Sequence, residues 1–167
     1  MKTFELIRED AKVNSHIKSK FVLAFYRVAH SSLHANLIIR ALCIPLRVSY
    51  RVTVDWLMGI DIPCKTSIGK RLVLYHGHAL VINEAAIIGD DCIFRHSVTI
   101  GNKVTPDGDS AAPRIGNGVE FGAGAVVIGP IEIGNGARIG ALSVVTHSVP
   151  AGVTVVSNPA RPLSSAH

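Results

Sequence analysis

The sequence predicts a mainly β fold, a parallel β-helix that follows a short α-helical N-terminal region. Three observations predict it: an apolar residue recurs at every sixth position over most of the chain, the first sixty residues lack this period, and two insertions interrupt it. A six-residue period matches neither the 3.6-residue turn of a helix nor a long two-residue strand alternation. It matches short strands that turn repeatedly around a triangular prism.

The period is unbroken from Ile115 to Val145. Its apolar positions there are Ile115, Phe121, Val127, Ile133, Ile139 and Val145, and glycine follows four of these six. Earlier positions are Ile62, Ile68 and Leu74, and then Ile82, Ile88, Phe94 and Ile100. Each unit then forms one flat face, three faces form a coil of about eighteen residues, and coils stack about 4.8 Å apart. The first residue of each unit is expected to point inward.

Composition is that of one soluble domain. The 167 residues are 48% hydrophobic, 17% charged and 5% aromatic, which is enough to bury a continuous core. Three cysteines and no secretion-signal pattern predict a cytoplasmic protein, and Cys92 falls at an inward position expected to be core. The net charge of +5 suits an anionic cofactor, whereas scattered basic residues without interleaved aromatics argue against nucleic acid.

The chain divides into residues 1–60, an α-helical N-terminal cap region, residues 61–157, the β-helix with a loop at 101–114, and residues 158–167, a C-terminal tail. Helices are expected over Phe21–His30, Ser32–Leu42 and Arg47–Met58, with a break at Pro45. We expect this region to pack on the first coil or on a neighbouring subunit, because a solenoid needs a cap. The alternative is peripheral contact of Leu33–Trp56 with an anionic membrane, at its inner face.

Two insertions mark where chemistry is expected. Two extra residues stand between Leu74 and Ile82, in the segment Tyr75-His76-Gly77-His78, and a longer polar loop, residues 101–114, follows Ile100. Extra residues at a solenoid corner commonly form the binding face. Counting along the coils stacks Phe94 on Leu74 and therefore His96 on His76.

Several segments together resemble the serine acetyltransferase branch of the hexapeptide acyltransferases. They are Gly59-Ile60-Asp61-Ile62, Ser67-Ile68-Gly69-Lys70, His76-Gly77, Val81-Ile82, Ile88-Gly89-Asp90-Asp91, Ser97-Val98-Thr99-Ile100-Gly101 and Ser157-Asn158-Pro159-Ala160-Arg161. Tyr26-Arg27-Val28-Ala29-His30 and Ile93-Phe94-Arg95-His96 further resemble the short acetyltransferases of colanic acid and other exopolysaccharide gene clusters.

The resemblance implies a homotrimer of left-handed β-helices that transfers acetyl from acetyl-CoA to a hydroxyl, with active sites between subunits. It implies His76 as general base and Asp61 as its carboxylate partner. A positioned imidazole that removes the hydroxyl proton is worth about 10² to 10⁴ in rate. A carboxylate on the far ring nitrogen fixes the tautomer and stabilises the imidazolium.

The cofactor site also follows from the resemblance. Ala123 and Ala141 would line the pantetheine arm, and Gly101 and Asn102 would border the thioester, with the Gly101 N–H as oxyanion donor. Arg161 is a candidate phosphate neighbour, together with Arg114 and Arg138.

The remaining candidates line the acceptor side. Tyr75 and His78 are expected to contact the substrate, and His96 either touches the acceptor or is an ordinary corner residue. No metal is expected: His76 and His96 would supply two zinc ligands, but Ala123 stands where the third would come from the next coil.

One departure from the family pattern bears on the acceptor. Serine acetyltransferases carry an Arg-His pair before the proline that ends the loop, where it holds the amino-acid carboxylate, and this chain has Ala111-Ala112 before Pro113. Tyr75 also replaces their acidic residue before the histidine. We therefore expect O-acetylation of a carbohydrate hydroxyl in exopolysaccharide biosynthesis. The alternatives are serine O-acetyltransferase, with Arg95 or Arg114 holding the carboxylate, and a non-catalytic β-helix used for binding or assembly.

Overall fold

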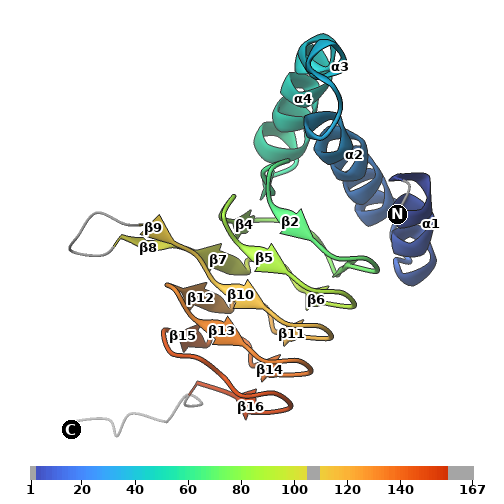
Figure 1. The fold of residues 1–167 in the computed structure, drawn as a ribbon. Helices are drawn as coiled ribbons and strands as arrows, with labels where there is room; N and C mark the ends of the chain where they lie inside the picture. Colours follow the sequence, from blue (N-terminus) through green and yellow to red (C-terminus); the bar gives the residue numbers. More distant parts are fainter. Residues whose placement is uncertain (1–2, 105–109, 158–167) are drawn as a thin grey trace, which may run out of the picture.

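A computed structural model describes residues 3–104 and 110–157. In Figure 1 the helices stand at one end of a prism of short parallel strands, which ends at β16. The helices are α1 (Thr3–Val13), α2 (Ile17–Leu33), α3 (Leu37–Leu42), α4 (Ile44–Tyr50) and a π-helical turn, η1 (Arg51–Leu57). None of the helices in these described ranges is long and apolar enough to span a bilayer.

Three parallel sheets form the sides of the prism. Sheet A contains β1 (Ile60–Asp61), β4 (Leu80–Ile82), β7 (Thr99–Gly101), β12 (Val126–Ile128) and β15 (Val144–Val145). Sheet B contains β2 (Ser67–Ile68), β5 (Ile87–Ile88), β10 (Arg114–Ile115) and β13 (Glu132–Ile133). Sheet C contains β3 (Val73–Leu74), β6 (Ile93–Phe94), β11 (Glu120–Phe121), β14 (Arg138–Ile139) and β16 (Thr154–Val155). A small antiparallel hairpin, β8 (Lys103–Val104) and β9 (Ser110–Ala111), extends the loop after β7.

The six-residue period is confirmed as the core of a left-handed β-helix. Every inward position that the period predicts is buried, as are the residues four positions later, Val119, Ala125, Ile131, Ala137, Ser143 and Val149. Ile115 pairs with Ile133, eighteen positions on, and Leu74 pairs with Phe94, twenty positions on, as the insertion requires. Cys92 is buried, as predicted, and burial raises the pKa of its thiol to about 11, so the thiol stays neutral.

The helices α1 and α2 cover the open edge of the first coil. Asn14 Nδ2 donates to the Leu72 carbonyl at 2.7 Å, and the Leu74 N–H donates to Asn14 Oδ1 at 3.0 Å. Ser19 Oγ donates to the Leu74 carbonyl at 2.8 Å, and Arg27 Nη1 to the Ile68 carbonyl at 2.7 Å. An uncovered strand edge presents unpaired N–H and C=O groups. The helices therefore supply the partners that a preceding coil would supply.

The observed helices differ from the predicted ones in three ways. Helix α1 was not predicted, because its Asp10 and Asn14 are stabilised by bonds to a coil about sixty residues later. The predicted helix Ser32–Leu42 is broken, because Asn36 caps a new helix by accepting from the Ile39 N–H at 2.9 Å. Pro45 lies inside α4, in its first turn, where a helix needs no N–H donor, so the break comes at Cys43.

Candidate active site

The bulge Tyr75–His78 lies at the corner between sheets C and A. The Tyr75 N–H donates to the Phe94 carbonyl at 2.8 Å, which aligns Tyr75 with Arg95. The Ser97 N–H donates to the His78 carbonyl at 2.9 Å, which aligns His78 with His96. The two extra residues are therefore His76 and Gly77. The prediction that His96 stacks on His76 is wrong: His78 stacks with His96, and His76 lies outside that column.

His76 has an unusual backbone and a neighbour from the helical region. Its φ of 54° lies in the left-handed region, which costs a non-glycine residue roughly 1 kcal/mol or more, and its side chain is exposed. Its ring centroid lies 5.2 Å from that of His16, in the turn between α1 and α2. Sequence reasoning did not identify His16, because no local pattern connects residues sixty positions apart. The helical region thus reaches the predicted catalytic corner.

Asp61 lies on the outer side of sheet A, paired with Val81. Within the described residues of one chain, no hydrogen bond or ion pair joins Asp61 to His76. Burial, and next the negative charge of Asp55, raises the pKa of the Asp61 carboxyl above its ordinary value, and Arg51 opposes the shift. The catalytic roles of His76 and Asp61 remain predictions.

Asp61 lines a pocket of about 740 Å³ between α4, η1 and sheet A. Gly101 and Asn102, predicted to border the thioester, line the same pocket. Asn83 Nδ2 donates to Asn102 Oδ1 at 3.1 Å, which fixes that amide beside the start of the loop. The helical wall contributes Arg47 and Arg51. Three of the predicted site residues thus share one cavity, away from the His76 corner.

Ala123 and Ala141 continue the corner column that His78 and His96 begin. The Gly124 N–H donates to the His96 carbonyl at 3.0 Å, and the Leu142 N–H donates to the Ala123 carbonyl at 2.9 Å. Two large rings are thus followed along the prism by two methyl groups, and Ala141 is exposed. The corners after His96 therefore carry no side chain larger than a methyl group at these two positions.

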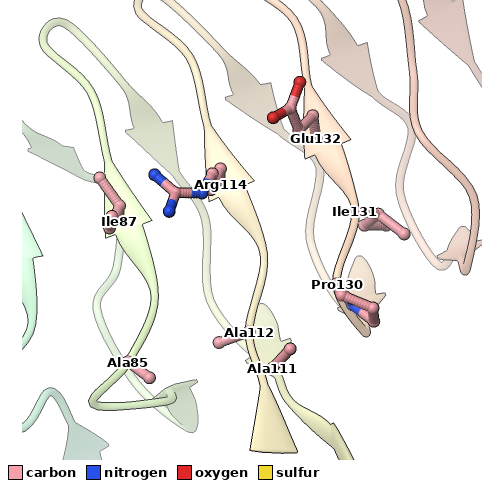
Figure 2. A pocket seen from close by; sticks show the side chains of 8 residues that line it. All are labelled: Ala85, Ile87, Ala111, Ala112, Arg114, Pro130, Ile131 and Glu132. Atoms are coloured by element: carbon pink, nitrogen blue, oxygen red, sulfur yellow. The ribbon is translucent and has the colours of Figure 1, made fainter.

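The loop returns to the prism beside a second pocket, of about 330 Å³. Figure 2 shows Ala111 and Ala112 at its rim and Arg114 and Glu132 on the neighbouring strands β10 and β13. The Arg114 side chain extends over Ile87 of β5 in this view. Arg114 is therefore the one cation among the residues that line this pocket in the described part of the chain.

Tyr75 and Arg95 lie next to one another on the predicted acceptor side. The Arg95 guanidinium carbon is 5.7 Å from the centre of the Tyr75 ring, and Arg95 Nη1 lies 2.7 Å from Glu120 Oε1. Arg95 is thus already paired with a carboxylate. Tyr75, His78 and His96 are all exposed and surround the corner.

Two further predictions concern Arg161 and the absence of a metal. Arg161, the predicted phosphate neighbour, lies outside the described residues. Within residues 3–104 and 110–157, no group of three or more His, Cys, Asp or Glu side chains is arranged to hold a metal ion.

Comparison with known proteins identifies the family of this chain. Residues 112–147 match the family model described as bacterial transferase hexapeptide (six repeats). A protein of Escherichia coli (strain K12), WcaB, which is named as an acetyltransferase of colanic acid biosynthesis, is 40% identical over 157 residues, covering 92% of this chain and 96% of its own. The chain belongs to the hexapeptide-repeat transferase family. It is an acyltransferase.

Solved structures of serine acetyltransferases share the fold. Isoform 3 from Entamoeba histolytica, in complex with cysteine, superposes with a TM-score of 0.75 at 28% identity, over 98% of this chain and 61% of that chain. A serine acetyltransferase in complex with CoA superposes with a TM-score of 0.70 at 30% identity, over 88% of this chain and 57% of that chain. This chain therefore spans less than two thirds of the length of those enzymes.

Proposed function

We propose that this acetyltransferase moves the acetyl group of acetyl-CoA to a carbohydrate hydroxyl in exopolysaccharide biosynthesis. His76 removes the hydroxyl proton while the oxygen attacks the thioester carbonyl, the C–S bond breaks, and the CoA sulfur takes the proton back from the imidazolium. The exposed position of His76 in the two-residue insertion supports this role, because extra residues at a solenoid corner commonly form the binding face.

The corner column supports acetyl-CoA as the donor. Ala123 and Ala141 carry only methyl groups, which suit a narrow chain such as pantetheine, and they follow His96, next to the His76 bulge. The complex of a related serine acetyltransferase with CoA supports the same cofactor. Basic residues such as Arg138 and Arg161 would contact the cofactor phosphates.

The outer faces of the prism support a homotrimer. Sheet A presents Val81, Val126 and Val144, the last 67% exposed, whereas sheets B and C carry charged side chains such as Arg114 and Arg138. The His76 bulge directly precedes sheet A strand β4, and the long loop directly follows strand β7. The two insertions therefore flank one apolar face. A three-fold assembly through that face would bring the bulge of one subunit to the loop of the next and complete a pocket.

The acceptor class rests on Ala111 and Ala112, two uncharged side chains at the rim of the 330 Å³ pocket. An amino-acid carboxylate needs charged donors, each buried charge-assisted hydrogen bond being worth about 1.5 to 3 kcal/mol. Arg95 does not replace them, because it is paired with Glu120. A sugar has no carboxylate, and its hydroxyls suit groups that both donate and accept, such as Tyr75 and the two histidines of the corner column.

Steady-state acetyl transfer tests the proposal, with release of CoA measured for panels of sugars, sugar nucleotides and free serine. We expect saturable acetylation of a carbohydrate and at least tenfold lower kcat/KM with serine. Efficient use of serine alone would contradict the proposal, and no CoA release with any acceptor would favour a non-catalytic module.

The variant Arg114→Gln distinguishes the proposed carbohydrate acetyltransferase from a serine acetyltransferase. Arg114 is the cation nearest to Ala111 and Ala112 along the chain, so a serine enzyme would use it for the carboxylate. Arg114→Gln should then raise the KM for serine more than tenfold, with Arg40→Gln, a change at an exposed arginine on α3, as the matched control. For a carbohydrate enzyme the two variants should give similar kinetics.

A further inference from the structure

Most of the helical region, residues 11–54, contains basic residues but no acidic ones. Residues 11–54 contain seven Lys or Arg and no Asp or Glu. Lys12, Arg27 and Arg51 pair with acids outside this stretch, namely Glu9, Asp10 and Asp55. In the described residues, no carboxylate lies within ion-pair distance of the other four, which are Lys18, Lys20, Arg40 and Arg47. Of these four, Arg40 and Arg47 lie on the neighbouring helices α3 and α4, at the same end of the helical region.

An apolar tip stands beside these two cations. It consists of Leu37, Ile38 and Leu42 on α3, whose side chains are 80%, 72% and 74% exposed. No residue of α3 is buried, so the helix contributes no side chain to the core. Figure 1 shows α3 at the end of the molecule opposite β16, where it projects beyond the prism. Three large aliphatic side chains so exposed in one short helix require an apolar contact elsewhere.

We propose that the apolar tip docks on an anionic lipid surface, into which its aliphatic side chains insert while the surrounding cations bind the headgroups. Basic residues near an anionic leaflet attract it, and apolar side chains on the same element partition below the headgroups. The proposed docking is peripheral, because only the side chains of the apolar tip enter the lipid surface.

Charge favours lipid over a second copy of the chain as the occupant. Two copies that met through the apolar tip would bring Arg40 and its neighbouring cations against their own equivalents, and like charges across an interface oppose association. The tip also lies at the helical end, apart from the apolar outer face of sheet A that the proposed trimer uses.

Docking would place the 740 Å³ pocket, which contains the predicted site residues Asp61, Gly101 and Asn102, near the lipid. Helix α4 directly follows the tip, and its Ile44, Arg47 and Val48 line the 740 Å³ pocket that contains Asp61. This consequence rests on the proposed function: a carbohydrate acceptor carried on a lipid would reach the pocket from the docked side. In a trimer the three tips point the same way along the prism axis, so their contacts with one surface reinforce each other.

Vesicle flotation without acetyl-CoA tests the docking. The purified chain is mixed with vesicles of phosphatidylcholine alone or with phosphatidylglycerol added. We expect co-flotation with the anionic vesicles only, and its loss at about 1 M salt, where the screening length falls to about 3 Å. The double variant Leu37→Ser, Leu42→Ser and the single variant Arg40→Glu should each lose at least tenfold in the bound fraction.

The matched control is Phe4→Ser, which removes an apolar side chain that is 76% exposed on α1, outside the apolar tip. Its binding should equal that of the unchanged chain. Absence of flotation, equal binding to neutral vesicles, or equal binding by the tip variants would overturn the proposal. A lower oligomeric mass of the tip variants in lipid-free buffer would overturn it in favour of a second copy. Acetylation of a soluble acceptor by the tip variants should be unchanged, so failure of the docking and failure of the proposed function are distinguishable.

Discussion

Removing the Asp10 carboxylate should strongly destabilise the fold. Asp10 and Arg27 are 1% and 2% exposed, and Arg27 Nε lies 2.8 Å from Asp10 Oδ2. Asp10 Oδ1 also accepts from the Leu72 N–H at 3.2 Å, on the edge of the first coil. In Asp10→Ala the guanidinium keeps its bonds to the Ile68 and Gly69 carbonyls but loses its counter-charge, and the Leu72 N–H loses its partner.

The expected magnitude follows from burial. Breaking a buried ion pair by removing one partner costs about 3 to 5 kcal/mol, because an uncompensated charge stays in the interior. For a chain of this size each kcal/mol lowers the melting temperature by about 2 to 4 °C, so we expect a decrease of about 6 to 20 °C. Asp10→Asn keeps a hydrogen-bonding side chain and should lie between Asp10→Ala and the unchanged chain.

Thermal unfolding followed by circular dichroism measures this at one fixed protein concentration, because an oligomer's stability depends on it. The control is Glu9→Gln on the same helix, which removes the partly exposed carboxylate that pairs with the exposed Lys12 and, at 4.0 Å, with Arg71. Exposed pairs contribute about 1 kcal/mol or less. A decrease in Asp10→Ala no larger than in Glu9→Gln would refute the reasoning that the buried pair holds the helices on the first coil.

Three further predictions concern the site and the pH dependence of stability. His76→Ala should lower the acetyl-transfer rate by about 10² or more with little change in CoA affinity, and Asp61→Asn should give a smaller loss of the same kind, both measured by steady-state kinetics and CoA titration. Ala141→Leu should raise the KM for acetyl-CoA at least tenfold without lowering the melting temperature, because Ala141 is an exposed residue of the corner column that we propose holds pantetheine. Burial lowers the pKa of the His30 imidazole, whose Nδ1 lies 2.8 Å from the Cys64 carbonyl oxygen, so protonation favours the unfolded chain. The free energy of unfolding should therefore decrease as the pH falls through about 6.5, and it should decrease less in His30→Gln. Urea unfolding at several pH values measures both.

The sequence predicts the prism well because its core is periodic. Each inward side chain pairs with the residue one coil away, as Phe121 pairs with Ile139 eighteen positions later, and the six-residue rule holds wherever no insertion interrupts it. If one six-residue unit departed from the pattern, the other units would still predict the prism. The long loop was located for the same reason, since residues that cannot follow the period must leave the prism.

The candidate site was less predictable because it lies where the period fails. Counting residues shows that two are extra between Leu74 and Ile82 but not which two, and only the bonds of Tyr75 and Ser97 identify His76 and Gly77. The pocket that groups Asp61 with Gly101 depends on α4 and η1, which obey no repeat. Contacts of this kind join distant segments and leave no local pattern.

The first coil has two features that the six-residue repeat does not provide: an edge covered by the helices, and the corner that holds the predicted general base His76. Asn14 and Ser19 bond to Leu72 and Leu74, immediately before the bulge, and His16 lies between them in sequence and contacts His76. The α1–α2 turn therefore holds the edge of the prism and the predicted general base together. Because a later coil has no such neighbour, the same histidine placed there would lack both the strained bulge and the covering turn. The non-repeating sixty residues thus place the covering turn beside the predicted general base at this end of the prism, near the surface that we propose docks on lipid.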